Sequence, residues 1–325
     1  MLAVPERVRA MMFRQPVPAS KFTAIEHPLE WIWPGFLATG CITLLTGEWK
    51  AGKTTLLSIL LSRFGIGGTI AGRPVRPVRA LVLSEEPESL WMERHTRLNF
   101  SDDIRFCCCP LLGRPSMEQW HWLIDDIDNA QRMPDVVVFD PLANFLPEQA
   151  EGYAPHLLDA LIPLRRLTQR GIAILMNHHP SRHNLRELQG RGGGALHAFV
   201  DIDVKLYNVP GERSDRVRRI LSKARPFGSN TEFRIELTED GKDYIEVPPD
   251  PVLGWREGIA VTRSVLLAAG QPLTVIEVWK GWQEDFPQPA LKTLRRWLAM
   301  AHADSLLARS GSGHRNDAFK YWVKE

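Results

Sequence analysis

Between residues 41 and 237 the chain alternates short apolar runs with longer segments in which apolar residues recur every three or four positions. Short runs of this kind predict β-strands, and the three-and-four spacing predicts amphipathic helices. The predicted strands are Ile42–Thr46, Ala80–Leu83, Ile104–Cys109, Val136–Phe139 and Ile172–Met176. The predicted helices are Thr54–Phe64, Glu88–Asn99, Met117–Ala130 and Pro155–Gln169, the last kinked at Pro163. This alternation is typical of an α/β domain whose mostly parallel sheet is covered by helices.

The pattern changes after Val200, where strands follow one another without helices between them. An antiparallel extension of the sheet is predicted, with a hairpin turn at Gly241. Its strands are Asp203–Tyr207, Val217–Ala224, Glu232–Leu237 and Tyr244–Val247.

The C-terminal part of the chain predicts a second, smaller domain. Prolines between residues 248 and 251 favour an extended linker. Helices are then predicted over Val261–Ala269, Val275–Trp282 and Ala290–Ala303, followed by a strand, a turn at residues 310–313 and a final strand. That order is the order of a winged helix-turn-helix. We therefore predict an N-terminal arm (residues 1–29), an α/β domain (30–247), a linker (248–254) and a winged-helix domain (255–325).

The length of 325 residues agrees with two domains. The composition, 44% hydrophobic and 24% charged, is that of an ordinary globular protein. No run of 18 apolar residues occurs and charged residues interrupt the N-terminus, so we expect a cytoplasmic protein without signal peptide or membrane span. The adjacent cysteines 107–109 predict a buried strand rather than a metal site or a disulfide framework. Six tryptophans on predicted helices are expected in the core: Trp91, Trp120, Trp122, Trp279, Trp282 and Trp297.

The net charge is only +2, but basic residues are concentrated in two regions. Residues 181–229 hold ten Lys or Arg against five Asp or Glu, and residues 251–325 hold ten against seven. Both regions are candidate surfaces for a polyanion.

One motif carries a specific chemistry. Residues 47–54 match GxxxxGK[ST] at every fixed position and lie between a predicted strand and a predicted helix, which is the context of a phosphate-binding loop. The loop predicts ATP and Mg²⁺ as ligands, with Lys53 on the β- and γ-phosphates and Thr54 on the metal. The predicted nucleotide-binding residues are Gly47, Glu48, Trp49, Lys50, Ala51, Gly52, Lys53, Thr54 and Thr55.

Carboxylates follow two of the predicted strands. Asp140 ends the apolar run VVVFD, the form of a Walker B segment, and would order the Mg²⁺ shell. Glu85 and Glu86 follow the strand ALVLS at the edge where open α/β sheets bind ligands. We expect Glu85 to orient the attacking water, with Glu86 as the second candidate; both could instead be helix N-terminal acids.

Together these segments are similar to the RecA/DnaB-type ATPases, and most closely to the RepA-like hexameric replicative helicases of plasmids. The resemblance rests on LLTGEWKAGKTTL, SEEP and LMNHHPSR and covers residues 30–247. It implies a RecA-like P-loop core that binds ATP between subunits of a homo-oligomeric ring, expected to be a hexamer. It further implies Lys223 and Arg225 as finger residues acting on the neighbour's γ-phosphate, and His178 or His179 as a sensor. The alternatives are exposed strand charges and a structural histidine pair.

Two candidate DNA contacts follow. The glycine-rich stretch after His179 is in the position of the mobile DNA-binding loop of RecA-like proteins, which implies single-strand contacts by Arg182, Arg186 and Arg191. In the winged-helix domain, residues 291–298 have the pattern of a recognition helix, with Lys292, Arg295 and Arg296 opposite the apolar face and Arg315 in the inferred wing. Duplex DNA is the expected partner there. This domain is not general in the resembled helicases.

Two functions remain open from the sequence. The first is a ring-forming, DNA-stimulated ATPase that moves on single strands during replication of a plasmid, phage or other mobile element. The alternative is an ATP-dependent DNA-binding adaptor that assembles on DNA and recruits a partner without unwinding. Strand displacement on a forked duplex distinguishes them.

Overall fold

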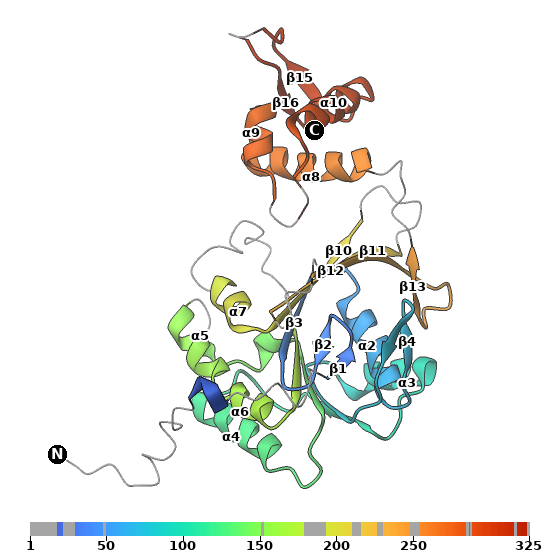
Figure 1. The fold of residues 1–325 in the computed structure, drawn as a ribbon, viewed down its shortest axis with the longest axis vertical. Coiled ribbons are helices and arrows are strands. Elements are labelled where there is room, and N and C mark those ends of the chain that lie inside the picture. Colours follow the sequence, from blue (N-terminus) through green and yellow to red (C-terminus); the bar gives the residue numbers. More distant parts are fainter. Residues whose placement is uncertain are drawn as a thin grey trace, which may run out of the picture.

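The structure is a computed structural model that describes residues 18–21, 30–47, 50–150, 153–178, 193–209, 216–225, 230–247, 254–283, 286, 288–314 and 317–323. Its largest feature is a nine-stranded sheet with the order β13-β12-β11-β10-β3-β9-β8-β6-β7 (Figure 1). The strands are β3 (Ile42–Gly47), β6 (Ala80–Ser84), β7 (Ile104–Cys108), β8 (Val136–Asp140), β9 (Ala173–His178), β10 (Ile202–Asn208), β11 (Val217–Ala224), β12 (Asn230–Leu237) and β13 (Tyr244–Val247).

The sheet confirms the predicted arrangement. Strands β10, β3, β9, β8, β6 and β7 are parallel, whereas β11, β12 and β13 continue the sheet in antiparallel fashion. The central strands are buried on both faces, which explains their nearly continuous apolar runs.

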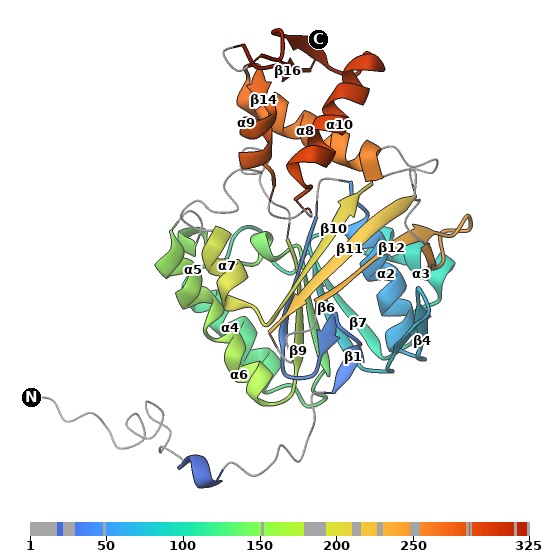
Figure 2. The same cartoon turned by 45° about the horizontal axis from the view of Figure 1, so that its top comes forward.

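Helices cover both faces of the sheet, as Figure 2 shows. One face packs against α2 (Lys53–Phe64) and α3 (Glu88–Leu98), and the other against α4 (Met117–Asp128), α5 (Ala154–Leu161), α6 (Leu164–Gln169) and α7 (Gly193–Phe199). Helix α4 begins with a capping box, because Ser116 accepts from the backbone N–H of Gln119 and the Gln119 side chain accepts in return. Pro163 separates α5 from α6 instead of kinking a single helix.

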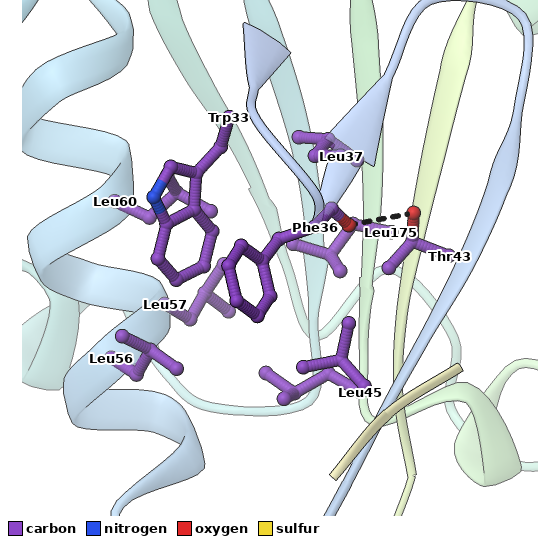
Figure 3. A pocket seen from close by; sticks show the side chains of 10 residues that line it. Trp33, Phe36, Leu37, Thr43, Leu45, Leu56, Leu57, Leu60 and Leu175 are labelled. Atoms are coloured by element: carbon purple, nitrogen blue, oxygen red, sulfur yellow. Dashed lines mark hydrogen bonds between the residues drawn. The ribbon is translucent and has the colours of Figure 1, made fainter. Parts of the chain in front are cut away.

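A small hairpin holds the strand and helix on either side of the phosphate-binding loop. Its strands are β1 (Trp31–Trp33) and β2 (Leu37–Ala38). Trp33 and Phe36 stack with ring centroids 4.3 Å apart, and they pack against leucines of α2 and β3 (Figure 3). The Thr43 hydroxyl donates to the carbonyl of Phe36 over 3.2 Å, which ties β3 to the hairpin. Between them remains a cavity of about 20 Å³, room for one water at most.

A second small hairpin, β4 (Gly68–Ile70) and β5 (Arg73–Val75), follows α2.

Two sequence expectations are wrong in part. The strand at the cysteines is the edge strand β7, so Cys107 and Cys108 are only partly buried, and Cys109 follows the strand and is exposed. Trp122 has 59% of its surface exposed, whereas Trp91, Trp120 and Trp282 are buried as predicted. Helical spacing placed Trp122 near the apolar face, but α4 turns that position to solvent.

The C-terminal elements pack around an apolar cluster of their own. They are α8 (Gly254–Ala269), β14 (Leu273–Thr274), α9 (Val275–Lys280), α10 (Leu291–Ala303), β15 (Ala308–Ser310) and β16 (Lys320–Trp322). The three strands form one sheet in the order β14-β16-β15. The cluster includes Val265, Val278, Leu294, Leu298 and Tyr321. Helix α8 begins at Gly254, seven residues before the predicted start. Among the described helices, none is long and apolar enough to cross a membrane.

Candidate nucleotide site

The loop between β3 and α2 has the backbone that a phosphate site needs. Gly47 passes so close to β10 that a Cβ there would lie 2.5 Å from the carbonyl oxygen of Leu206. Gly52 has φ of +90°, in the left-handed region that favours glycine. Both glycines of the motif are therefore required by the local geometry, one by close approach and the other by conformation.

Lys53 lies at the start of α2 and is buried, with 3% of its surface exposed. Its ammonium donates to the carbonyl oxygen of Gly47 over 2.8 Å, which closes the loop on itself. The first turn of α2 has no acidic residue, so the helix N-terminus stays positive. A triphosphate at this point would meet a buried cation and the backbone N–H groups of a helix start.

Strand register brings the other predicted groups to the same edge. Ser84 at the end of β6 pairs with Asp140 at the end of β8, and Thr46 of β3 pairs with His178 at the end of β9. The carboxyl ends of four parallel strands thus meet beside the loop, the usual ligand position in open α/β sheets. His178 is half-buried there, and its β3 partner Thr46 directly precedes Gly47, the first residue of the loop.

Asp140 is the buried carboxylate of this edge, with 3% of its surface exposed. The pKa of Asp140 is raised to about 6, mainly by burial; the hydrogen bond from the Asn177 amide and the charge of Arg94 oppose this rise, and Glu86 and Glu85 add to it. The Asn177 Oδ1 is buried without a hydrogen-bond partner among the described residues.

This oxygen-rich corner fits a Mg²⁺ ion, which prefers carboxylate, hydroxyl and water oxygens. The Thr54 hydroxyl and the Asp140 carboxylate would hold it, as the motif predicts. A cation beside Asp140 would favour the ionised form that burial disfavours.

Glu85 and Glu86 have different partners. Glu86 forms a two-bond ion pair with Arg94 of α3, whose guanidinium also lies 4.6 Å from the ring centroid of Trp91. Glu85 is exposed and accepts a hydrogen bond from the Asn144 amide. Partial burial raises the pKa of Glu85, and the neighbouring Glu86 adds to this rise. Glu85 is accordingly the carboxylate available to a water, and Glu86 is held in place by Arg94.

Sequence reasoning missed two side chains that flank the loop from the antiparallel extension. Arg218 of β11 donates from Nε to the Ala51 carbonyl over 2.8 Å. The Tyr244 hydroxyl of β13 would lie 3.6 Å from a Cβ at Gly52. Burial raises the pKa of Tyr244 to about 12, although Arg218 opposes this, so the hydroxyl stays protonated. No sequence motif indicates these residues, because only the successive pairing of β10, β11, β12 and β13 brings them to the loop.

Lys223 and Arg225 lie away from their own loop. Lys223 pairs with Asp203 of β10, and Asp203 pairs with Leu44, three residues before Gly47. Five residues of extended strand separate Lys223 from Arg218, a distance of about 17 Å. The Arg225 guanidinium donates to the carbonyl oxygen of Ala198. Neither side chain belongs to the cluster around Lys53.

The other predicted contacts fall in two groups. Lys292, Arg295 and Arg296 are exposed on α10, opposite the buried Leu294 and Leu298. Outside the described residues lie Glu48, Trp49, His179, Arg182, Arg186, Arg191 and Arg315.

Comparison with known proteins gives a family. Among solved structures, the ATPase domain of G40P matches 64% of this chain and 85% of its own length, with 13% identity and a TM-score of 0.46. No curated protein matches the sequence. Residues 7–184, more than half of the chain and including the loop, Asp140 and both glutamates, match the AAA domain family AAA_25. The chain therefore belongs to this family of P-loop ATPases.

Proposed function

We propose that this protein is a ring-forming, ATP-hydrolysing motor that acts on DNA, in the manner of the RepA-like helicases, during replication of a plasmid, phage or other mobile element. The observation that carries the proposal is the cluster at one sheet edge: Lys53 closed on Gly47, with Asp140 and Glu85 on neighbouring strand ends.

The chemistry follows from these positions. Lys53 and the start of α2 bind the β- and γ-phosphates, and the Mg²⁺ ion, when bound, neutralises charge on the phosphate oxygens. Glu85 orients a water and takes its proton as the water oxygen bonds to the γ-phosphorus. The bond from that phosphorus to the β–γ bridging oxygen breaks, and ADP leaves. Asn144 keeps the Glu85 carboxylate in position for this attack.

The positions of Lys223 and Arg225 support the proposal of a ring. About 17 Å of strand separates Lys223 from the residue that contacts its own loop, so any γ-phosphate that Lys223 contacts would belong to another copy. An arginine finger supplied in trans contributes about 10³–10⁵ in rate.

Mixing two inactive variants tests this trans arrangement. Lys53→Ala damages the loop and Arg225→Ala damages the finger, so each variant alone should be nearly inactive. In a mixed ring, an intact loop from one variant meets an intact finger from the other at about a quarter of the interfaces. We expect ATP turnover to recover to about that fraction on mixing. Full activity of Arg225→Ala alone, or no recovery in rings shown to be mixed, contradicts the trans finger.

One observation favours the alternative function, an adaptor that uses ATP as a switch. The C-terminal unit has the element order of a winged helix, and its α10 exposes Lys292, Arg295 and Arg296. Such a module suits site-specific duplex binding better than translocation. Strand displacement on a forked duplex supports the motor, whereas nucleotide-dependent assembly on duplex without displacement supports the adaptor.

A further inference from the structure

Strand β11 brings Arg218 to the phosphate-binding loop from the side of the antiparallel extension. Gly47 at the end of β3 pairs with Leu206 of β10, and Arg218 pairs with Asn208, two residues further along β10. Arg218 therefore lies just beyond the end of β3, level with the loop. Its Nε donates to the carbonyl oxygen of Ala51 over 2.8 Å, although the two residues are 167 positions apart in the chain.

The loop backbone at this point has the conformation of an anion-binding concavity. Gly52 is left-handed, with φ of +90° and ψ of 24°, and Lys53 after it is the first residue of α2. A left-handed residue followed by a right-handed one turns successive N–H groups to the same side, where together they bind an anion. The N–H groups of Gly52 and Lys53 thus share one side of the loop, at the start of α2.

The carbonyl that Arg218 contacts belongs to the same peptide unit as the Gly52 N–H. The Ala51–Gly52 peptide bond is trans, and in a planar trans unit the C=O and the N–H point in opposite directions. With the Ala51 oxygen directed at Arg218 on β11, the Gly52 N–H points away from β11. Arg218 consequently contacts the peptide unit on the side opposite to its N–H.

Without Arg218, this peptide unit has another orientation open to it. Ala51 is fully buried, so its carbonyl oxygen would lose a hydrogen bond inside the protein, which is costly. Glycine adopts a wide range of backbone conformations, so the Ala51–Gly52 unit can rotate at little conformational cost. The rotated unit would turn the carbonyl oxygen towards the anion-binding side and remove one N–H donor from it.

We propose that Arg218 is a positioning residue of the nucleotide site, which holds the Ala51–Gly52 peptide unit so that the Gly52 N–H is directed at a phosphate. Tyr244 borders the same part of the loop, because its hydroxyl lies 3.6 Å and the Arg218 Nε lies 4.0 Å from the position of a Cβ at Gly52. The proposal rests on the proposed function only in that the loop binds a nucleotide, and it requires neither a ring nor DNA.

Two substitutions at Arg218 separate the hydrogen bond from the charge. The side-chain amide nitrogen of glutamine is as many bonds from Cα as the Nε of arginine, so Arg218→Gln keeps a donor without the charge. In methionine a methyl group takes this place, so Arg218→Met removes both. The measurement is the Kd of a fluorescent, nonhydrolysable ATP analogue with Mg²⁺, for the full chain and for each variant.

Arg216→Met is the matched control. Arg216 directly precedes β11, and its guanidinium forms an ion pair with Glu236 of β12 over 3.4 Å. This variant loses the same charge and the same side-chain length as Arg218→Met, two residues away. Its affinity for the analogue should equal that of wild type.

Arg218→Met should weaken binding of the analogue by about 10- to 100-fold, because one backbone hydrogen bond to a charged phosphate is lost. Arg218→Gln should bind within about threefold of wild type, because its amide still donates to Ala51. Hydrogen exchange of the free Arg218→Met protein should be faster in residues 50–55 and unchanged in the strands of the large sheet.

Three results would overturn the proposal. The first is wild-type affinity in Arg218→Met. The second is an equal loss in Arg218→Gln, because the charge of Arg218 and not its hydrogen bond would then hold the phosphate. The third is faster exchange throughout the sheet of Arg218→Met, which would make Arg218 a residue needed for folding. Failure of the proposed function looks different: ATP turnover is indifferent to DNA, while the affinities of the variants still differ as stated.

Discussion

At the scale of single residues, the two adjacent glutamates show how partners decide roles. The sequence placed Glu85 first and Glu86 second as the candidate base but gave no partner for either; in the structure Arg94 holds Glu86, while Glu85 is exposed beside Asn144. A general base must be free to accept a proton, and general-base catalysis contributes about 10²–10⁴ in rate.

We therefore predict a split between two isosteric variants. Glu85→Gln should lower ATP turnover by at least about a hundredfold, and Glu86→Gln by less than about tenfold, because in the proposed mechanism Glu85 takes the proton of water. Binding of a fluorescent ATP analogue should persist in both. A Glu86→Gln variant with the larger loss would reverse the assignment.

Asp140 gives a prediction about pH. Its pKa is raised from 3.8 to about 6, so the folded protein holds this proton more firmly than the unfolded chain does. Stability from this group is therefore greatest below pH 4 and falls as the pH rises towards 6. Without Mg²⁺ and nucleotide, Asp140→Asn should gain about 2.5 kcal/mol over wild type in unfolding free energy between pH 4 and pH 7. Denaturant unfolding across that range measures it, and a difference that does not change with pH would contradict it.

The site could be predicted where one short segment carries the chemistry. The loop glycines, Lys53 and Asp140 each stand in such a segment, so their grouping follows from the carboxyl ends of parallel strands meeting at one edge. Asn144, Asn177 and Arg218 could not be predicted in this way. Arg218 is 167 residues from Ala51 in the chain, and only the pairing of β11 with β10 brings the two together.

At the scale of elements, apolar periodicity predicted the strands of the large sheet and most of the helices. It was least reliable at boundaries such as the start of α8 and the break at Pro163, which depend on tertiary packing and on a missing N–H. Burial of a single side chain, such as Trp122, depends on the rotation of its helix on the sheet. Periodicity fixes this rotation only approximately.

The contact between helices α8 and α10 gives a prediction at the scale of elements. A Cβ at Gly258 would lie 2.1 Å from the Trp297 ring. Gly258→Ala should therefore destabilise the C-terminal unit by about 1–3 kcal/mol, although alanine is favoured in helices by about 1 kcal/mol. Hydrogen exchange should become faster in α8 and α10 and stay unchanged in α2.

Gly194 of α7 is the matched control, because a Cβ there meets nothing within 4 Å. Gly194→Ala should leave exchange in α7 unchanged or slow it. Slower exchange of α8 in Gly258→Ala would contradict the prediction, because the helix-favouring effect of alanine would then outweigh the clash with Trp297.

At the scale of the whole molecule, one ATPase core carries a sheet extension and a basic C-terminal unit on the same chain. The net charge of +2 gives little reason to expect nucleic-acid binding, but the basic residues are not evenly spread. Exposed cations gather on α10, so salt should weaken any DNA effect on the enzyme.

The most direct measurement is ATP hydrolysis by wild type and Lys53→Ala, each alone, with single-stranded DNA and with duplex, at two salt concentrations. We predict hydrolysis that depends on Lys53, rises with single strands and loses this stimulation as salt increases. Hydrolysis that survives Lys53→Ala, or that is indifferent to DNA at both salt concentrations, would contradict the claim that this P-loop ATPase is a DNA motor.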